Sequence, residues 1–293
     1  MTTRAEVRSG PPRGRALGGP SLTLEAALGT EPDWAALGID PEVPSIARVY
    51  NAFLGGTDNF PADRRVVEGV AAAVPEILTV ATLNRAVLGR GVRFLVQQGI
   101  DQFLDLGSGL PTAENTHQVA RAVNPGARVV YVDKDPLVAA HAAALIGDDL
   151  TAMVTADLRS PGTVLAAPAV RRLIDFDRPV ALLLVGILHH LHDDEDPRGV
   201  VEAYLAAVPS GSYLFVSHFC DSGPEAREAE QKFLSLLGTG RFRTETEIAA
   251  FFDGLDLLEP GLVPTPLWHP DHPVTTSPQV GDRLIWAGIA RKP

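Results

Sequence analysis

The chain has 293 residues and a formal net charge of -11 at pH 7. This length is sufficient for one large α/β core with a smaller appendage, because single cores stop growing near about 250 to 300 residues. The negative charge provides no global basic field, which disfavours nucleic acid as a partner. One cysteine, Cys220, excludes an internal disulfide. We see no secretory signal and no apolar run of membrane-spanning length, so we expect a cytoplasmic protein without a membrane partner.

The N-terminal third of the chain is expected to hold a tail and a helical cap. The first 20 residues are rich in Gly, Pro and Arg and have hardly any apolar periodicity. They cannot offset their own ordering entropy, so residues 1–43 are predicted to be a largely flexible tail. Residues 44–98 form the predicted cap, with helical patterning over Pro44–Leu54, Ala62–Val74 and Thr79–Gln98.

From residue 99 to 293 the pattern changes to short β-rich runs that alternate with segments of helix length. The predicted strands are Phe103–Leu106, Val129–Val132, Ala152–Thr155, Val180–Val185, Tyr213–His218, Leu255–Val263 and Arg283–Arg291. The predicted helices are Thr112–Ala122, Pro136–Leu145, a stretch within Pro161–Ile174, Pro197–Val208, Glu225–Leu237 and Glu245–Phe252. This alternation is typical of βαβ units and predicts an α/β domain with a mostly parallel sheet.

A glycine turn follows the first predicted strand. The strand contains Asp105 and runs into Gly107, Ser108 and Gly109, and a helix is predicted next. Glycine allows the backbone to approach a ligand closely and to adopt positive φ. Backbone N–H groups at a helix N-terminus then face the ligand, so this turn is predicted to be a binding site.

Acidic residues end the next two predicted strands. Asp133 follows the second strand, where a carboxylate can accept the two hydroxyls of an adenosine ribose, and Asp157 follows the third. Each acid alone could simply cap the next helix. The order of a glycine turn, an acid and a second acid at consecutive strand ends instead favours a nucleoside site at one edge of the sheet.

A nicotinamide dehydrogenase would share this first turn but would have a third glycine three residues after Gly109. Thr112 occupies that position, preceded by Pro111. The difference disfavours a dinucleotide, whose pyrophosphate needs a close approach to the helix.

The segments Phe103–Thr112 and Ala127–Pro136 resemble a family of S-adenosylmethionine-dependent methyltransferases long catalogued as a domain of unknown function. The likeness extends to Arg48–Phe60, Asn84–Arg85, Leu188–His190 and Gly211–Leu214. The family commonly has an acid after its tyrosine, where this chain has Asn51. The resemblance implies the class I, Rossmann-like fold with a seven-stranded sheet, and S-adenosyl-L-methionine as the cofactor.

The strand-end pattern and the resemblance together define the cofactor-binding residues that we expect. They are Tyr50, Gly55, Gly56, Asp58, Asn59, Asn84, Arg85, Asp105, Gly107, Ser108, Gly109, Asp133, Lys134, Asp157, Leu158 and Gly186. We interpret Tyr50–Phe60 as part of a cover over the site, in which the glycines permit closure. The alternative is a plain turn in which Asp58 or Asn59 caps the following helix.

His189 and His190 follow the fourth predicted strand and are the candidate catalytic residues. Either could serve as a general base if the methyl acceptor must lose a proton. Alternatively, the two histidines only orient a loop. The neighbouring His192, Asp193 and Asp194 lack a strict ligand spacing, so we expect no metal site and no dependence on metal.

The sequence therefore predicts an S-adenosylmethionine-dependent methyltransferase that acts on a small-molecule acceptor. Two alternatives remain open at this point. One is a regulator that binds the cofactor without turnover, and the other is a nicotinamide-dependent oxidoreductase.

Overall fold

The computed structural model describes residues 33–111, 114–145, 148–275 and 277–293. Within them, eight strands form one sheet in the order β3-β2-β1-β4-β5-β8-β6, and β7 pairs with β8. The strands are β1 Gln102–Leu106, β2 Arg128–Asp133, β3 Thr151–Thr155, β4 Ala181–Val185, β5 Tyr213–Phe219, β6 Asp256–Leu257, β7 Val263–Pro264 and β8 Ile285–Arg291. Strands β1 to β5 are parallel and β8 is antiparallel to β5. The predicted mostly parallel sheet is confirmed.

The C-terminal part of the sheet differs from the prediction in two respects. The predicted strand Arg283–Arg291 begins only at Ile285, because Val280–Arg283 forms a short helix. The predicted strand Leu255–Val263 is two short strands, β6 and β7, which pair with opposite ends of β8. A turn separates them, in which the Gly261 N–H donates to the Leu258 carbonyl at 2.8 Å and Gly261 has a φ of 91°. Pro260 has no N–H to donate to a ladder, and Pro and Gly in succession are typical of a turn.

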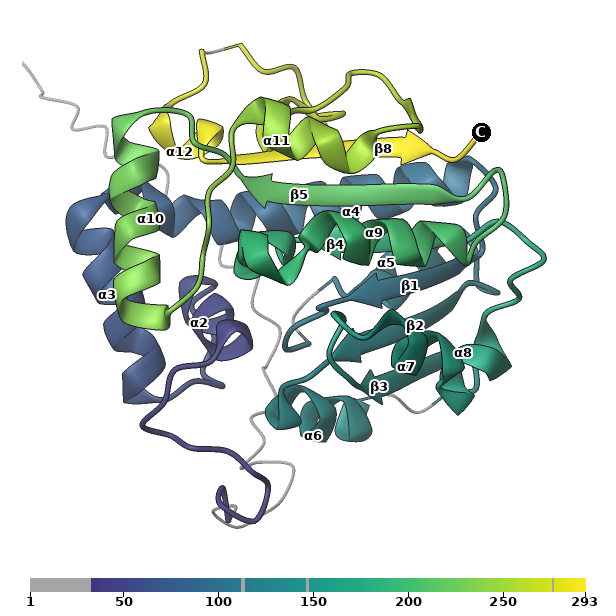
Figure 1. Ribbon diagram of the computed structural model, residues 1–293, viewed down its shortest axis with the longest axis horizontal. Helices are drawn as coiled ribbons and strands as arrows, with labels where there is room; N and C mark the ends of the chain where they lie inside the picture. Colours follow the sequence, from purple (N-terminus) through teal and green to yellow (C-terminus); the bar gives the residue numbers. More distant parts are fainter. Residues whose placement is uncertain (1–32, 112–113, 146–147, 276) are drawn as a thin grey trace, which may run out of the picture.

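Helices cover both faces of the sheet (Figure 1). The α-helices are α2 Ile46–Phe53, α3 Pro61–Ala73, α4 Val80–Gln97, α5 Thr116–Val123, α6 Pro136–Leu145, α7 Pro161–Ala166, α8 Pro168–Leu173, α9 Pro197–Ala206, α10 Pro224–Leu237, α11 Glu245–Ala249 and α12 Val280–Arg283. The 3-10 helices are η1 Pro75–Thr79, η2 Leu188–His190, η3 Asp193–Glu195, η4 Ala250–Phe252 and η5 Thr265–Leu267. Helices α4 and α5 pack on one face and α7, α8 and α9 on the other. None of the helices within the described ranges is long and apolar enough to cross a bilayer.

The strand side chains alternate between two apolar clusters, as the pleat requires. On β1, Leu104 and Leu106 join the cluster under α8 and α9, whereas Phe103 joins the cluster under α4. Helix α4 contributes Val87, Leu95 and neighbouring residues to this second cluster. The proposed division at residue 98 stays a prediction, but α4 is packed directly on the sheet.

A third apolar cluster lies beyond the carboxyl ends of the parallel strands. It joins α3, η1, α10 and the start of β8, and Figure 1 shows α2, α3 and α10 together at that end of the sheet. The predicted tail lies outside the described residues up to residue 32. From residue 33 onward the chain is described, and Ile39 is buried against Leu137 and Val138 of α6.

Candidate active site

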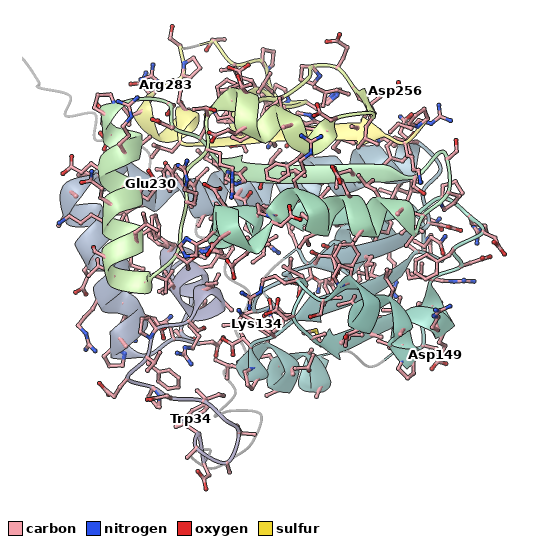
Figure 2. The ribbon with its side chains drawn as sticks, in the orientation of Figure 1. Trp34, Lys134, Asp149, Glu230, Asp256 and Arg283 are labelled. Atoms are coloured by element: carbon pink, nitrogen blue, oxygen red, sulfur yellow. The ribbon has the colours of Figure 1, made fainter. Side chains whose placement is uncertain are left out.

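A cavity of about 590 Å³ lies at the carboxyl ends of the parallel strands. Open α/β sheets bind their ligands at this edge. Thirteen of the sequence-predicted site residues line it: Tyr50, Asn84, Arg85, Asp105, Gly107, Ser108, Gly109, Asp133, Lys134, Asp157, Leu158, Gly186 and His190. Figure 2 shows Lys134 beside the end of β2, facing the N-terminal helices. The structure thus brings together residues from six separate segments of the chain.

The glycine turn after β1 forms the floor of the cavity. Gly107 and Gly109 have φ values of 75° and 67°, and the N–H groups of Gly107 and Ser108 donate to the Val132 carbonyl at 2.8 and 3.1 Å. A Cβ on Gly107 would overlap the side chain of Ile187. Both the backbone conformation and the space therefore require glycine at position 107.

Asp133 ends β2 and is held by two backbone N–H groups. Its Oδ2 accepts from Gly109 at 2.8 Å and its Oδ1 accepts from Asp135 at 3.0 Å. Burial raises the pKa of Asp133 from its ordinary value. A carboxylate has about four lone-pair positions, so each oxygen retains capacity for one more donor. Two neighbouring hydroxyls, such as those of a ribose, fit this arrangement.

Asp105 and Arg85 place opposite charges along one part of the cavity wall. Asp105 accepts from Thr116 Oγ1 at 2.7 Å, and Arg85 donates to the Glu114 carbonyl at 3.0 Å. Burial raises the pKa of Asp105 to about 6, against the lowering effects of the Thr116 hydrogen bond and the Arg85 charge. The pair is suited to a ligand that carries both an ammonium and a carboxylate.

Asp157 belongs to an ion-pair network that the sequence did not suggest. Arg159 binds it through two guanidinium nitrogens and also pairs with Glu195, while Lys134 Nζ lies 3.6 Å from Asp157 Oδ2. The Arg159 hydrogen bonds lower the pKa of Asp157 to about 2. This carboxylate is ionised throughout the physiological range and can accept hydrogen bonds there.

Residues 38–48 form one wall of the cavity, and none of them was among the predicted site residues. Arg48 is buried and pairs with the buried Asp63 at 3.1 Å, and its guanidinium also donates to the carbonyls of Asp40 and Val43. The Ser45 hydroxyl donates to Asp135, which ties this wall to the loop after β2. The apolar residues among positions 34–43 are the feature of the sequence that could have indicated a packed segment there.

The predicted cover Tyr50–Phe60 contributes only Tyr50 to the cavity lining. Gly55, Gly56, Asp58 and Asn59 lie in the connection between α2 and α3 and do not line it. Asn59 donates to the side chain of Asn51 and to the Gly56 carbonyl, both at 2.8 Å. Asp58 lies 3.5 Å from His141 of α6. Their assignment to the cofactor stays a prediction.

The turn with the two histidines is held by the segment after α10. Its four successive carbonyls, from Leu188 to Leu191, accept hydrogen bonds from residues 239–243. Thr239 donates to His190 at 2.8 Å, the Arg241 N–H to His189 at 2.7 Å, and the buried Arg243 guanidinium to Leu188 and Leu191 at 3.2 and 3.0 Å. Because each carbonyl has a partner, the turn has a fixed backbone.

His190 lines the main cavity, but His189 does not. Burial, together with the charges of Lys134 and His192, lowers the pKa of His190 to about 3. Burial also lowers the pKa of His189 well below its ordinary value. Both imidazoles are therefore neutral at physiological pH, and His190 is a weak base. Among the described residues, no group of three or more His, Cys, Asp or Glu is arranged to hold a metal ion.

Asp105→Asn is expected to stabilise the ligand-free protein at neutral pH. The folded state holds the Asp105 pKa near 6 rather than 3.8, so it binds more protons than the unfolded state between those values. This group therefore lowers wild-type stability as pH rises through that window, by up to about 3 kcal/mol. Urea denaturation of both proteins near pH 5 and pH 7.5 measures the difference. The expectation fails if wild type and variant show the same pH dependence.

The parallel sheet, the glycine turn after β1 and Asp133 at the end of β2 define a nucleoside-binding, Rossmann-like enzyme with the class I methyltransferase fold. The sequence profile of a family described as S-adenosyl methyltransferase matches residues 32–293. The chain belongs to this family, and its cofactor is S-adenosyl-L-methionine. The residues present fit this cofactor, because the backbone of the glycine turn lines the cavity and both Asp133 oxygens retain the capacity to accept a hydroxyl.

Two solved structures are similar to the chain over nearly their whole length. A candidate methyltransferase from Thermobifida fusca YX is 49% identical, with a TM-score of 0.85, and the match covers 89% of this chain and 99% of that one. A protein of the DUF574 family from Streptomyces avermitilis MA-4680 is 36% identical, with a TM-score of 0.83 and coverages of 87% and 99%. No curated protein sequence matches the chain significantly.

Proposed function

We propose that the enzyme transfers the methyl group of S-adenosylmethionine to a small-molecule acceptor bound in the 590 Å³ cavity. The observation that carries this proposal is the wall formed by residues 38–48, which lies over the strand ends and is tied down by Arg48–Asp63 and Ser45–Asp135. A pocket of this volume is typical of sites for small ligands. The net charge of -11 also disfavours a nucleic-acid acceptor.

The cofactor, when bound, supplies an electrophilic methyl group on its sulfonium. In our proposal Asp133 accepts the ribose hydroxyls, and Asp105 and Arg85 bind the ammonium and carboxylate of its amino-acid end. The adenine base of the cofactor is bound by Lys134, Asp157 and Leu158, which also line the cavity. Methyl transfer is an in-line displacement, so much of the acceleration can come from holding the acceptor in the right orientation.

His190 is the proposed contact to the acceptor among the two predicted catalytic histidines, because it lines the cavity and its turn is fixed. With a pKa of about 3 it is neutral above about pH 4 and offers one donor and one acceptor. It is suited to orienting an acceptor by a hydrogen bond rather than to removing a proton from a weak acid. An acceptor atom that already carries a reactive lone pair fits this site best.

A second candidate is a regulator that binds the cofactor without turnover. The low pKa values of His189 and His190 favour it, because neither side chain is a strong base at neutral pH. This candidate requires the same cofactor affinity but no product.

Methyl-deuterated S-adenosylmethionine distinguishes the two candidates. The enzyme is incubated with a cell extract divided into a small-metabolite fraction and a macromolecular fraction, and S-adenosylhomocysteine is quantified by mass spectrometry. We expect S-adenosylhomocysteine and a deuterated product in the small-metabolite fraction only. Product in the macromolecular fraction alone would contradict a small-molecule acceptor. Cofactor binding without S-adenosylhomocysteine in either fraction would support the regulator.

A further inference from the structure

A second, smaller cavity of about 40 Å³ adjoins the main one. It lies between α2, the start of α4, α10 and the ends of β5 and η2. The two cavities share lining residues, among them Tyr50, Asn84, Gly186 and His190, so the smaller cavity is a recess directly beside the main one. We call it the apolar recess.

The walls of the apolar recess carry no charge. Most of its lining side chains are aliphatic or aromatic, including Phe53, Ile77, Phe219 and Phe233, and none of its lining residues is Asp, Glu, Lys or Arg. Its four polar side chains are Tyr50, Asn84, His189 and His190. Burial raises the pKa of the Tyr50 phenol and lowers the pKa values of both histidines, so all four are neutral at physiological pH.

The polar groups of the recess are unequally satisfied. Tyr50 donates to the Ala81 carbonyl at 3.2 Å and accepts from Asn84 at 3.1 Å, and Asn84 also accepts from Ser217 at 2.5 Å. In contrast, the Nδ1 atoms of His189 and His190 are buried and have no hydrogen-bond partner. A buried polar atom without a partner is costly, so a ligand whose hydrogen-bonding group reaches either Nδ1 would relieve that cost.

We propose that the apolar recess binds an uncharged, apolar end of the methyl acceptor, of about one or two carbon atoms, next to a neutral hydrogen-bonding group such as a hydroxyl or an amide. This assignment rests on the proposed function for the main cavity. The size follows from the volume, because one water occupies about 30 Å³ of liquid. A charged group would lose its hydration without gaining a counterion there, which is unfavourable. The recess therefore selects acceptors by charge as well as by size.

Filling the recess tests this assignment. Ala81 is buried in its wall near the start of α4, whereas Ala86 is exposed on the same helix. Ala81→Val adds two carbon atoms in the recess, and Ala86→Val makes the same change in solvent with the same effect on helix propensity. Val80→Ile, also in the recess wall, is the second filling variant if Ala81→Val does not fold.

The probes are butanol, butylammonium and butanoate, each added to the protein with S-adenosylhomocysteine and observed by saturation-transfer NMR. We expect binding of butanol through its terminal methyl group, and binding at least about tenfold weaker for both charged probes. The filling variants should bind butanol at least about tenfold more weakly, whereas Ala86→Val should bind it as the wild type does. The affinity for S-adenosylhomocysteine should be the same in all of these proteins.

The assignment is overturned if no probe binds, if a charged probe binds better, or if the filling variants and Ala86→Val behave alike. These outcomes are independent of turnover. If the filling variants abolish butanol binding but the protein produces no S-adenosylhomocysteine, the binding role of the recess is supported and the proposed enzyme activity is rejected. If Ala81→Val leaves the turnover of an identified acceptor unchanged, the proposed activity is supported and the binding role of the recess is rejected.

Discussion

Asp133→Ala is expected to weaken the binding of S-adenosylmethionine by at least about tenfold, because it removes two charge-assisted hydrogen bonds to the ribose, each worth roughly 1.5 to 3 kcal/mol. Both carboxylate oxygens already accept backbone N–H groups, from Gly109 and Asp135, and these bonds aim them. The ribose hydroxyls would complete an arrangement that exists before the ligand binds, so little of the binding energy is lost to ordering. Isothermal titration calorimetry measures the change.

Asp133→Asn is the matched control for charge and shape. Asparagine keeps one carbonyl oxygen as an acceptor, so its affinity should lie between those of the wild type and Asp133→Ala. Both variants need a melting curve without ligand, because the lost backbone contacts also affect the glycine turn. A folded Asp133→Ala protein with wild-type affinity would reject the ribose assignment.

Asp63→Ala is expected to destabilise the protein by about 3 to 5 kcal/mol, the range for breaking one partner out of a buried ion pair. Asp63 is fully buried and accepts from the N–H groups of Ser45 at 3.0 Å and Phe60 at 2.8 Å as well as from Arg48. Without it, the Arg48 guanidinium stays buried without a counterion and two backbone donors lose their partner. Chemical denaturation measures the free energy of unfolding.

Two further variants separate the buried charge from a general effect of substitution. The double variant Arg48→Met/Asp63→Ala removes both charges and should recover a large part of the lost stability. Glu202→Ala breaks the exposed ion pair between Glu202 and Arg198 on α9 and should change stability only slightly. If Asp63→Ala and Glu202→Ala are equally mild, Arg48–Asp63 does not hold residues 38–48 over the cavity.

The parts of the site that the sequence predicted are those encoded within a few residues. Gly107 and Gly109 lie in the turn after β1, and Asp133 is the last residue of β2, so the strand pattern alone places them at one edge of the sheet. The same reasoning placed His190 at that edge after β4. The order of strands and helices along the chain was also predictable, because it depends on hydrophobic patterns with periods of 2 and 3.6 residues, which are visible within short stretches of sequence.

The wall of the cavity was not predictable in the same way, because its contacts join distant parts of the chain. Ser45 and Asp135 are 90 residues apart in sequence, and Arg48 pairs with Asp63 across two helices. A carboxylate near the start of a helix is normally interpreted as a helix cap, and Asp63 lies in the first turn of α3. Its second role, as the counterion of Arg48, depends on the packing of α2 against α3.

The division of the strand after residue 255 illustrates a missed local signal. Pro260 and Gly261 were present in the sequence, and both are typical of turns rather than of strand interiors. The apolar residues on either side of them pair with the same strand, β8, so the run had the composition of one strand and the connectivity of two.

A crystal structure of the enzyme with S-adenosylhomocysteine tests the central claim most directly. The account predicts the ligand in the 590 Å³ cavity, with both ribose hydroxyls within about 3 Å of the Asp133 carboxylate and the amino-acid end between Asp105 and Arg85. A ligand bound elsewhere, or one whose ribose leaves Asp133 bonded only to Gly109 and Asp135, would contradict it.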